Sequence, residues 1–86
     1  MDKKEILKKA KECLIKNNIN FEEDSLDSLI EKKGSRLRGG ETGNVFIIPY
    51  NVFIGNELAQ NFIYFSIENE KFLYIITSRG YIEIDN

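Results

Sequence analysis

Two arginines next to two glycines are the residues in this chain best suited to hold a charged ligand. Arg36 and Arg38 carry guanidinium forks that match phosphate or carboxylate. Gly39 and Gly40 leave backbone amides accessible to the same ligand, and Lys33 adds a cation upstream. The segment is therefore a candidate anion-binding loop. A solvated connection is the favoured explanation, because the segment follows a predicted helix end, whose partial negative charge repels anions.

Most groups that perform catalysis are missing from the sequence. Histidine is absent, which excludes Ser-His and Cys-His nucleophile pairs and most zinc sites. No glycine-rich nucleotide-binding motif and no nucleophile-elbow motif is present. The one cysteine, Cys13, has aliphatic neighbours at helical spacing and is expected to be a small buried hydrophobe. We therefore expect a protein that is not an enzyme and that has neither a cofactor nor a structural metal.

Length and charge narrow the class of protein. The chain has 86 residues, which is enough for one domain. Its formal net charge is −2, which makes nucleic acid an unlikely partner, because nucleic-acid binders usually carry a clear basic excess. No secretory signal and no apolar run long enough to cross a membrane is recognisable. The sequence thus predicts a single cytoplasmic domain without membrane association.

Two helices are predicted in the amino-terminal part, at about 3–16 and 22–33. Asp2 and Glu5 have the spacing of a capping box, and the apolar residues that follow recur at three- and four-residue steps. The second segment begins with acids and ends with lysines, which suits a helix dipole, and Gly34 follows as a predicted helix-ending residue.

After a predicted loop at 34–43, the apolar pattern alternates with a period of two, as in strands. Four strands are predicted, at about 45–54, 62–68, 72–78 and 81–85. Pro49 indicates that the first of them is an edge strand or contains a bulge. The predicted fold class is α+β, with two N-terminal helices packed on one face of a four-stranded antiparallel meander.

The turns suggest a register. A two-residue turn at Asn69 and Glu70, followed by a three-residue turn at residues 78–80, places eight large apolar side chains on one face. This predicted core face comprises Ile63, Phe65, Ile67, Phe72, Tyr74, Ile76, Ile82 and Ile84.

The opposite, outer face of the predicted sheet carries aromatic and apolar side chains with an acidic rim. We predict a partner-binding site there, because two short helices cover one side only and large exposed apolar patches are uncommon in monomers. Its predicted residues are Phe62, Tyr64, Leu73, Ile75, Tyr81, Glu83 and Asp85. The occupant is a protein partner or a second copy of the chain in a homodimer. The alternative is that the first strand or a loop covers this face.

Two functions follow from these features. The first is a small protein-binding module, an inhibitor or immunity-type protein that blocks another protein through its outer sheet face. The alternative is a nucleotide- or RNA-binding domain that uses the Arg36 and Arg38 loop for phosphates and the sheet aromatics for bases. The strand half counts against this alternative, since from residue 44 onward five acids outnumber Lys71 and Arg79.

Overall fold

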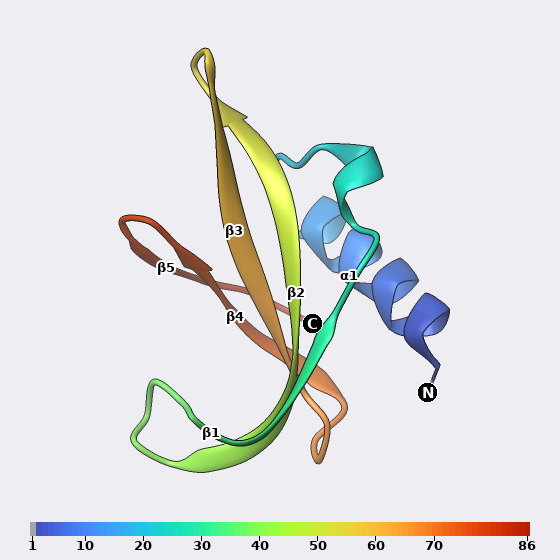
Figure 1. The fold of residues 1–86 in the computed structure, drawn as a ribbon, viewed down its shortest axis with the longest axis vertical. Coiled ribbons are helices and arrows are strands. Elements are labelled where there is room, and N and C mark those ends of the chain that lie inside the picture. The colour runs from blue at the N-terminus through green and yellow to red at the C-terminus, as the bar shows by residue number, and fades with distance from the viewer. Residues whose placement is uncertain (1) are drawn as a thin grey trace.

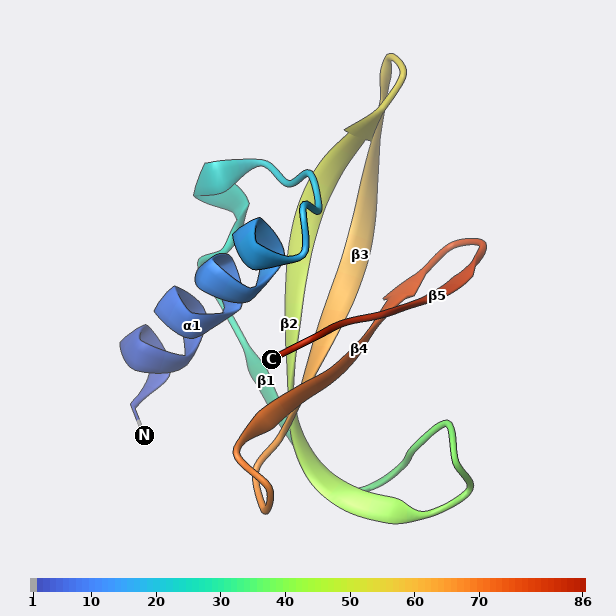
Figure 2. The ribbon, with the colours of Figure 1, turned by 180° about the vertical axis from the view of Figure 1, so that it is seen from behind.

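The fold is one helix followed by a five-stranded antiparallel sheet, in a computed structural model that describes residues 2–86 (Figure 1). The elements, in chain order, are α1 (Lys3–Lys16), the 3₁₀ turn η1 (Glu23–Ser25), β1 (Ile30–Arg36), β2 (Thr42–Ile54), β3 (Glu57–Ser66), β4 (Lys71–Thr77) and β5 (Gly80–Glu83). The strands lie in the order β1-β2-β3-β4-β5, so each pairs with the next along the chain. The α1 helix lies on one side of this meander, and the β1–β2 loop curls round the other (Figures 1 and 2).

The predicted first helix is confirmed. The Glu5 amide donates to Asp2 Oδ1 over 2.8 Å, which caps the first turn. The helix ends where Asn17 caps it and Asn18 adopts a left-handed φ of 57°. The apolar stripe of α1 is buried, as its spacing predicted; it comprises Ile6, Ala10, Cys13 and Leu14.

The predicted second helix, at about 22–33, is wrong. Only Glu23–Ser25 form a helical turn there, and Ile30–Arg36 form the edge strand β1, which pairs with β2. Tertiary pairing overrides local propensity here, because β2 offers a free edge to this segment. The lysines that suggested a helix end instead lie on an edge strand, where their charge discourages pairing with other chains.

Gly34 does adopt the left-handed conformation expected of a helix-ending glycine, but for another reason. Its φ is 62°, and it lies where the β1–β2 register shifts between Lys32 and Ser35. The Gly34 amide donates to Asn44 Oδ1 over 3.0 Å, so the side chain of β2 satisfies the group freed by the bulge. The predicted loop at 34–43 is correspondingly shorter and spans residues 37–41 between β1 and β2.

The β2–β3 hairpin is longer than predicted and extends beyond the rest of the sheet (Figure 1). A two-residue turn joins Ile54 to Glu57, with Gly55 at a φ of 63°. Pro49 lies within β2, opposite Phe62 and beyond the end of β1. Backbone N–H groups alternate in direction along a strand. At Pro49, which has no N–H, the direction is away from β3 and toward the edge of β2 that β1 does not cover.

The predicted register of β4 and β5 is also wrong. Ser66 pairs with Lys71, so the turn between β3 and β4 has four residues and not the predicted two. A bulge at Leu73 then shifts the register, and Ile63 pairs with Ile75. Inserting one residue moves every later side chain of the strand to the opposite face.

The bulge and the altered turns rearrange the two faces of the sheet. Phe72 and Ile75, three residues apart, both lie in the core, so the period of two fails across Leu73. Tyr74 and Ile76, predicted in the core, are half-buried on the outer face. Ile67 is half-buried in the turn and lies outside the core as well.

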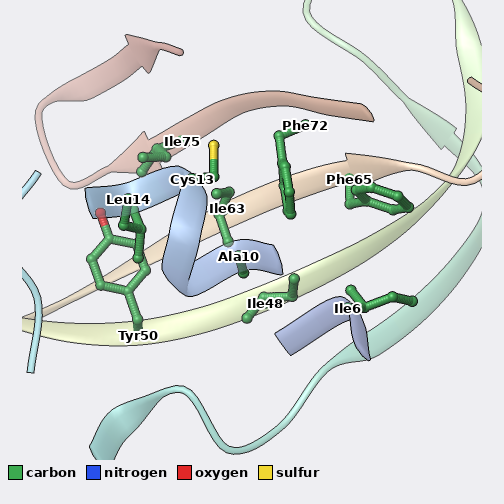
Figure 3. Packing of buried hydrophobic residues seen from close by; sticks show 10 residues of the cluster. All are labelled: Ile6, Ala10, Cys13, Leu14, Ile48, Tyr50, Ile63, Phe65, Phe72 and Ile75. Carbon is green, nitrogen blue, oxygen red and sulfur yellow. The ribbon is translucent and has the colours of Figure 1, made fainter. Parts of the chain in front are cut away.

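The core fills the space between α1 and the inner face of the sheet (Figure 3). Its buried members are Ile6, Ala10, Cys13, Leu14, Ile48, Tyr50, Ile63, Phe65, Phe72 and Ile75. The rings of Phe65 and Phe72 meet edge to face, 4.9 Å apart between centroids. The Asn61 amide donates to the buried hydroxyl of Tyr50 over 3.3 Å, so this polar group has a partner.

Two polar connections hold the C-terminal residues against α1 and β4. After β5, the backbone of Asp85 bonds twice with the side chain of Asn17 at the end of α1. The side-chain amide of Asn86 accepts from the Phe72 amide at 2.7 Å and donates to its carbonyl at 2.8 Å. Asn86 therefore takes the place of a strand residue at the bulged edge of β4.

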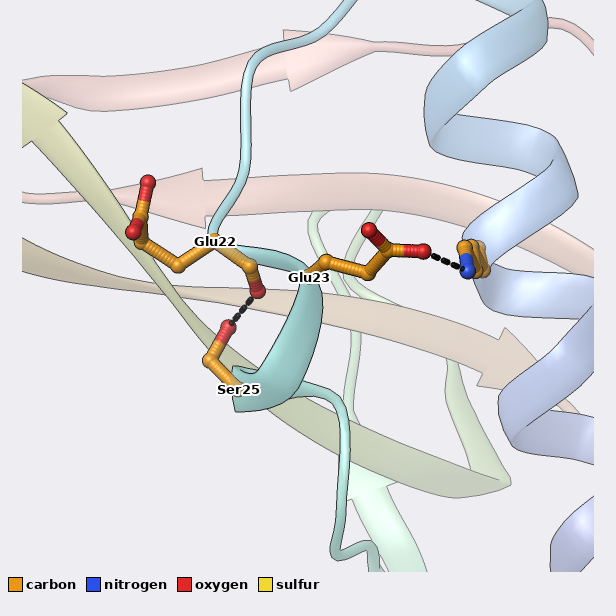
Figure 4. Close-up of polar contacts among 4 residues, drawn as sticks. Glu22, Glu23 and Ser25 are labelled. Atoms are coloured by element: carbon orange, nitrogen blue, oxygen red, sulfur yellow. Dashed lines mark hydrogen bonds and ion pairs between the residues drawn. The ribbon is translucent and has the colours of Figure 1, made fainter.

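A third polar connection joins η1 to its neighbours (Figure 4). Glu23 pairs with Lys11 of α1, and the hydroxyl of Ser25 bonds to the Glu22 carbonyl. The Asn51 amide of β2 donates to Ser25 Oγ over 2.9 Å, and Asn51 accepts from the Glu22 amide. These bonds occupy the edge of β2 that β1 leaves free.

Candidate binding face

The outer face of the sheet carries an open hollow of about 610 Å³. The β1–β2 loop supplies one part of its lining, and β4, β5 and the residues after β5 supply the rest, which we call the floor. The lining residues are Leu37, Arg38, Gly39, Glu41, Leu73, Tyr74, Tyr81, Glu83, Ile84 and Asp85. The loop curls over this face because β2 bends strongly between its β1-paired end and its centre (Figures 1 and 2).

Arg38 connects the loop to the floor of the hollow. Its guanidinium carbon lies 3.2 Å from the centroid of the Tyr81 ring, a cation–π contact. The Arg38 amide also donates to the Tyr74 hydroxyl over 3.3 Å. The Tyr81 side chain nevertheless stays 41% exposed, so the loop covers it only in part.

The outer face in and beside the hollow is aromatic because β3, β4 and β5 place tyrosines on the same face. The rings of Tyr64 and Tyr74, which are paired across β3 and β4, lie 5.1 Å apart. Partial burial raises the pKa of Tyr64, and the neighbouring Tyr74 raises it further. Both effects keep the Tyr64 phenol neutral, so it offers ring surface and a hydrogen-bond donor rather than a charge.

The structure brings together only part of the predicted partner-binding set. Leu73, Tyr81, Glu83 and Asp85 line the hollow. Phe62 and Tyr64 lie beside it on the same face of β3 and are half-buried.

Ile75 was assigned to this set through the wrong register. It is fully buried in the core, and the bulge at Leu73 is the reason.

The predicted anion-binding set is spread over a strand and a loop. Lys33 and Arg36 belong to β1, whereas Arg38, Gly39 and Gly40 belong to the loop.

The surroundings of the loop are unfavourable for an anion. A carboxylate oxygen of Glu41 lies 3.3 Å from the position that a Cβ on Gly39 would take. An approaching anion therefore meets a negative charge at the glycine that was expected to receive it.

Sequence reasoning missed four of the lining residues, Leu37, Glu41, Tyr74 and Ile84. Tyr74 was hidden by the bulge, for which the sequence has no clear signal. Sequence reasoning also missed the exposed apolar tip of the β2–β3 hairpin, formed by Phe53, Ile54 and Leu58. The dipeptide Gly55-Asn56, a known two-residue turn signal, was present and indicates this hairpin.

Among residues 2–86, no group of three or more His, Cys, Asp or Glu side chains is placed to hold a metal ion. Burial raises the pKa of the Cys13 thiol, and the opposing effects of Lys16 and Asn17 are smaller. The thiol form is therefore favoured, which is the opposite of an activated nucleophile.

Comparisons of the chain with protein-family models, curated proteins and solved structures found no match. Within the described part of the chain, no helix has the length and apolar character needed to cross a membrane. The function must therefore be argued from the site itself.

Proposed function

We propose that this chain is a small, non-catalytic protein-binding module, of the inhibitor or immunity type, that blocks another protein through the outer face of its sheet. We further propose that it acts in the cytoplasm, since its single cysteine makes no internal disulfide. The observation that carries the proposal is the open hollow of about 610 Å³ on a face that α1 does not cover.

The side chains of this face suit a protein interface. Tyrosines are enriched where proteins bind proteins, because they give a large contact area and lose little rotamer freedom. Tyr81, Tyr74 and Tyr64 supply such groups on rigid strands. Phe53 and Leu58, which face each other near the tip of the β2–β3 hairpin, are both more than half exposed.

The charge of the hollow supports a protein partner over a nucleic acid. Among the lining residues in the described part of the chain, Glu41, Glu83 and Asp85 contribute three negative charges and Arg38 contributes one positive charge. The lining therefore has a formal net charge of −2, which repels phosphates and attracts basic protein surfaces.

The experiment compares co-purification by the wild-type protein with that by two variants. Tyr81→Ala removes the most exposed aromatic group of the hollow. Ile15→Ala is the matched control, because it removes an exposed apolar side chain from the solvent side of α1. Proteins are quantified by mass spectrometry, and nucleic acid by absorbance.

We expect one protein to be retained by wild type and by Ile15→Ala, and to be depleted about tenfold or more with Tyr81→Ala. Retention of nucleic acid in its place contradicts the proposal. Retention of a protein that is unchanged in Tyr81→Ala, or that is lost in Ile15→Ala, also contradicts the proposal.

A further inference from the structure

We infer that the hollow binds an arginine- or lysine-bearing segment of the partner, and that the incoming cation replaces Arg38 on the Tyr81 ring. This inference rests on the proposed function and names the chemistry of the partner. In the free protein, Arg38 then occupies the position on the Tyr81 ring that the partner's cation takes in the complex.

The contact between Arg38 and Tyr81 shows what the floor accepts. A guanidinium centred 3.2 Å from the ring demonstrates that the outer face of Tyr81 is open to a planar cation. The negative face of an aromatic ring attracts any such cation, whichever chain carries it. A partner arginine can make the same contact.

The acids of the hollow are free to pair with that cation. The ion pair found in residues 2–86 joins Lys11 to Glu23, on the other side of the molecule. The carboxylates of Glu41 and Glu83 make no hydrogen bond or ion pair among the described side chains, and both residues are exposed. An incoming cation therefore meets two carboxylates in the lining of the same hollow that Arg38 leaves unpaired, and their negative charge attracts it without direct contact at the Tyr81 ring.

Arg38 is held loosely enough to leave. The loop closes on itself, since the Leu37 amide donates to the Glu41 carbonyl over 2.8 Å and the Gly40 amide to the Leu37 carbonyl over 3.0 Å. Gly40 takes the positive φ of 88° that this turn requires. The turn therefore survives when the Arg38 side chain rotates away. The cost of exchange is the contact with Tyr81 itself.

This arrangement makes Arg38 a competitor of the partner. While Arg38 covers the Tyr81 ring, only a fraction of the molecules can bind the partner. Removing the Arg38 side chain raises the apparent affinity by the inverse of that fraction. Removing a carboxylate from the same hollow must lower the affinity. The two substitutions therefore have opposite effects, whereas loss of fold would lower the affinity in both.

The probe is an acetylated, amidated hexapeptide of alternating arginine and glycine, titrated into isotope-labelled protein. The backbone amide signals of Gly39, Tyr81 and Glu83 are followed by nuclear magnetic resonance. A peptide with glutamate in place of arginine and an oligouridylate serve as competing ligands. Thermal melts by circular dichroism check the fold of each variant.

We expect the arginine peptide to shift these signals and the other two ligands to leave them unchanged. Arg38→Ala should tighten binding about two- to fivefold, and Glu83→Gln should weaken it by a similar factor. Glu57→Gln, which makes the same charge change at the start of β3 near the hairpin tip, should leave the affinity as it is.

Weaker binding by Arg38→Ala, equal weakening by Glu57→Gln, or binding of the oligouridylate overturns the inference. If the arginine peptide does not bind while co-purification still depends on Tyr81, the inference is wrong and the proposed function stands. If the peptide results hold but co-purification ignores Tyr81, the cation site is supported and the proposed function is wrong.

Discussion

The two faces of the sheet are built from similar residue types but are completed differently. On the inner face, Phe65, Phe72 and Ile75 pack under α1 and are removed from water. On the outer face, Tyr74 lies beside Tyr64, and the tip of a loop contacts Tyr81 through one cation–π contact and Tyr74 through one hydrogen bond. Apolar residue type alone therefore does not decide what is core. What decides it is which face receives the helix.

The largest expected effect is on the inner face. Phe65→Ala should lower the free energy of unfolding by about 3–5 kcal/mol, because it leaves a cavity under α1. Ile67→Ala, at a side chain outside the core, should cost less than half as much. Urea melts of both variants measure the difference. Equal losses would mean that Ile67 belongs to the core after all.

A smaller effect is expected at the bulge of β4, where the side chains change from one face of the sheet to the other. Asn86→Ala removes both side-chain bonds to the Phe72 backbone at the bulge. The expected loss is about 1–3 kcal/mol, since each bond contributes on the order of 1 kcal/mol. Urea melts provide the value, and hydrogen exchange at the Phe72 amide gives a local check. An unprotected Phe72 amide in the wild-type protein would contradict this connection.

The smallest expected effect concerns the exposed contact between α1 and η1. Lys11 holds the pKa of the Glu23 carboxyl below its ordinary value, mainly by hydrogen bonding and then by charge. A lowered pKa in the folded state means stability present above the unfolded pKa and lost as pH falls through the folded one. In Lys11→Met, the pKa of Glu23 should return to its ordinary value. Carboxyl chemical shifts recorded against pH measure this pKa. An unchanged titration curve would show that Lys11 does not contact Glu23 in solution.

The sequence was sufficient for elements whose pattern is local. The capping pair Asp2 and Glu5 and the apolar stripe that follows predicted α1 correctly, because helix spacing and caps act within a few residues. The three later strands were located for the same reason, since alternation is visible in the sequence.

The sequence was insufficient where distant pairing decides the structure. Whether the residues around Ile30 form a helix or a strand depends on the free edge of β2, which lies far along the chain. The bulge at Leu73 occurs together with the Asn86 contact to Phe72 and the four-residue turn at 67–70, and it moves Ile75 to the core and Tyr74 to the outer face. Ile75 therefore lies in the core, whereas the other predicted partner-binding residues lie in or beside the hollow of the outer face. That this face binds a partner stays a prediction.

The most direct test of the account is a footprint of the complex. Hydroxyl-radical labelling of the free protein and of the protein bound to its captured partner, read by mass spectrometry, reports which side chains the partner covers. If the partner binds the outer face of the sheet, Tyr81, Tyr74 and Leu37 should be protected, and Ile15 on α1 should be labelled equally in both states. Protection of Ile15 with unchanged labelling of Tyr81 would contradict it, because the partner would then bind the helix and not the outer face of the sheet.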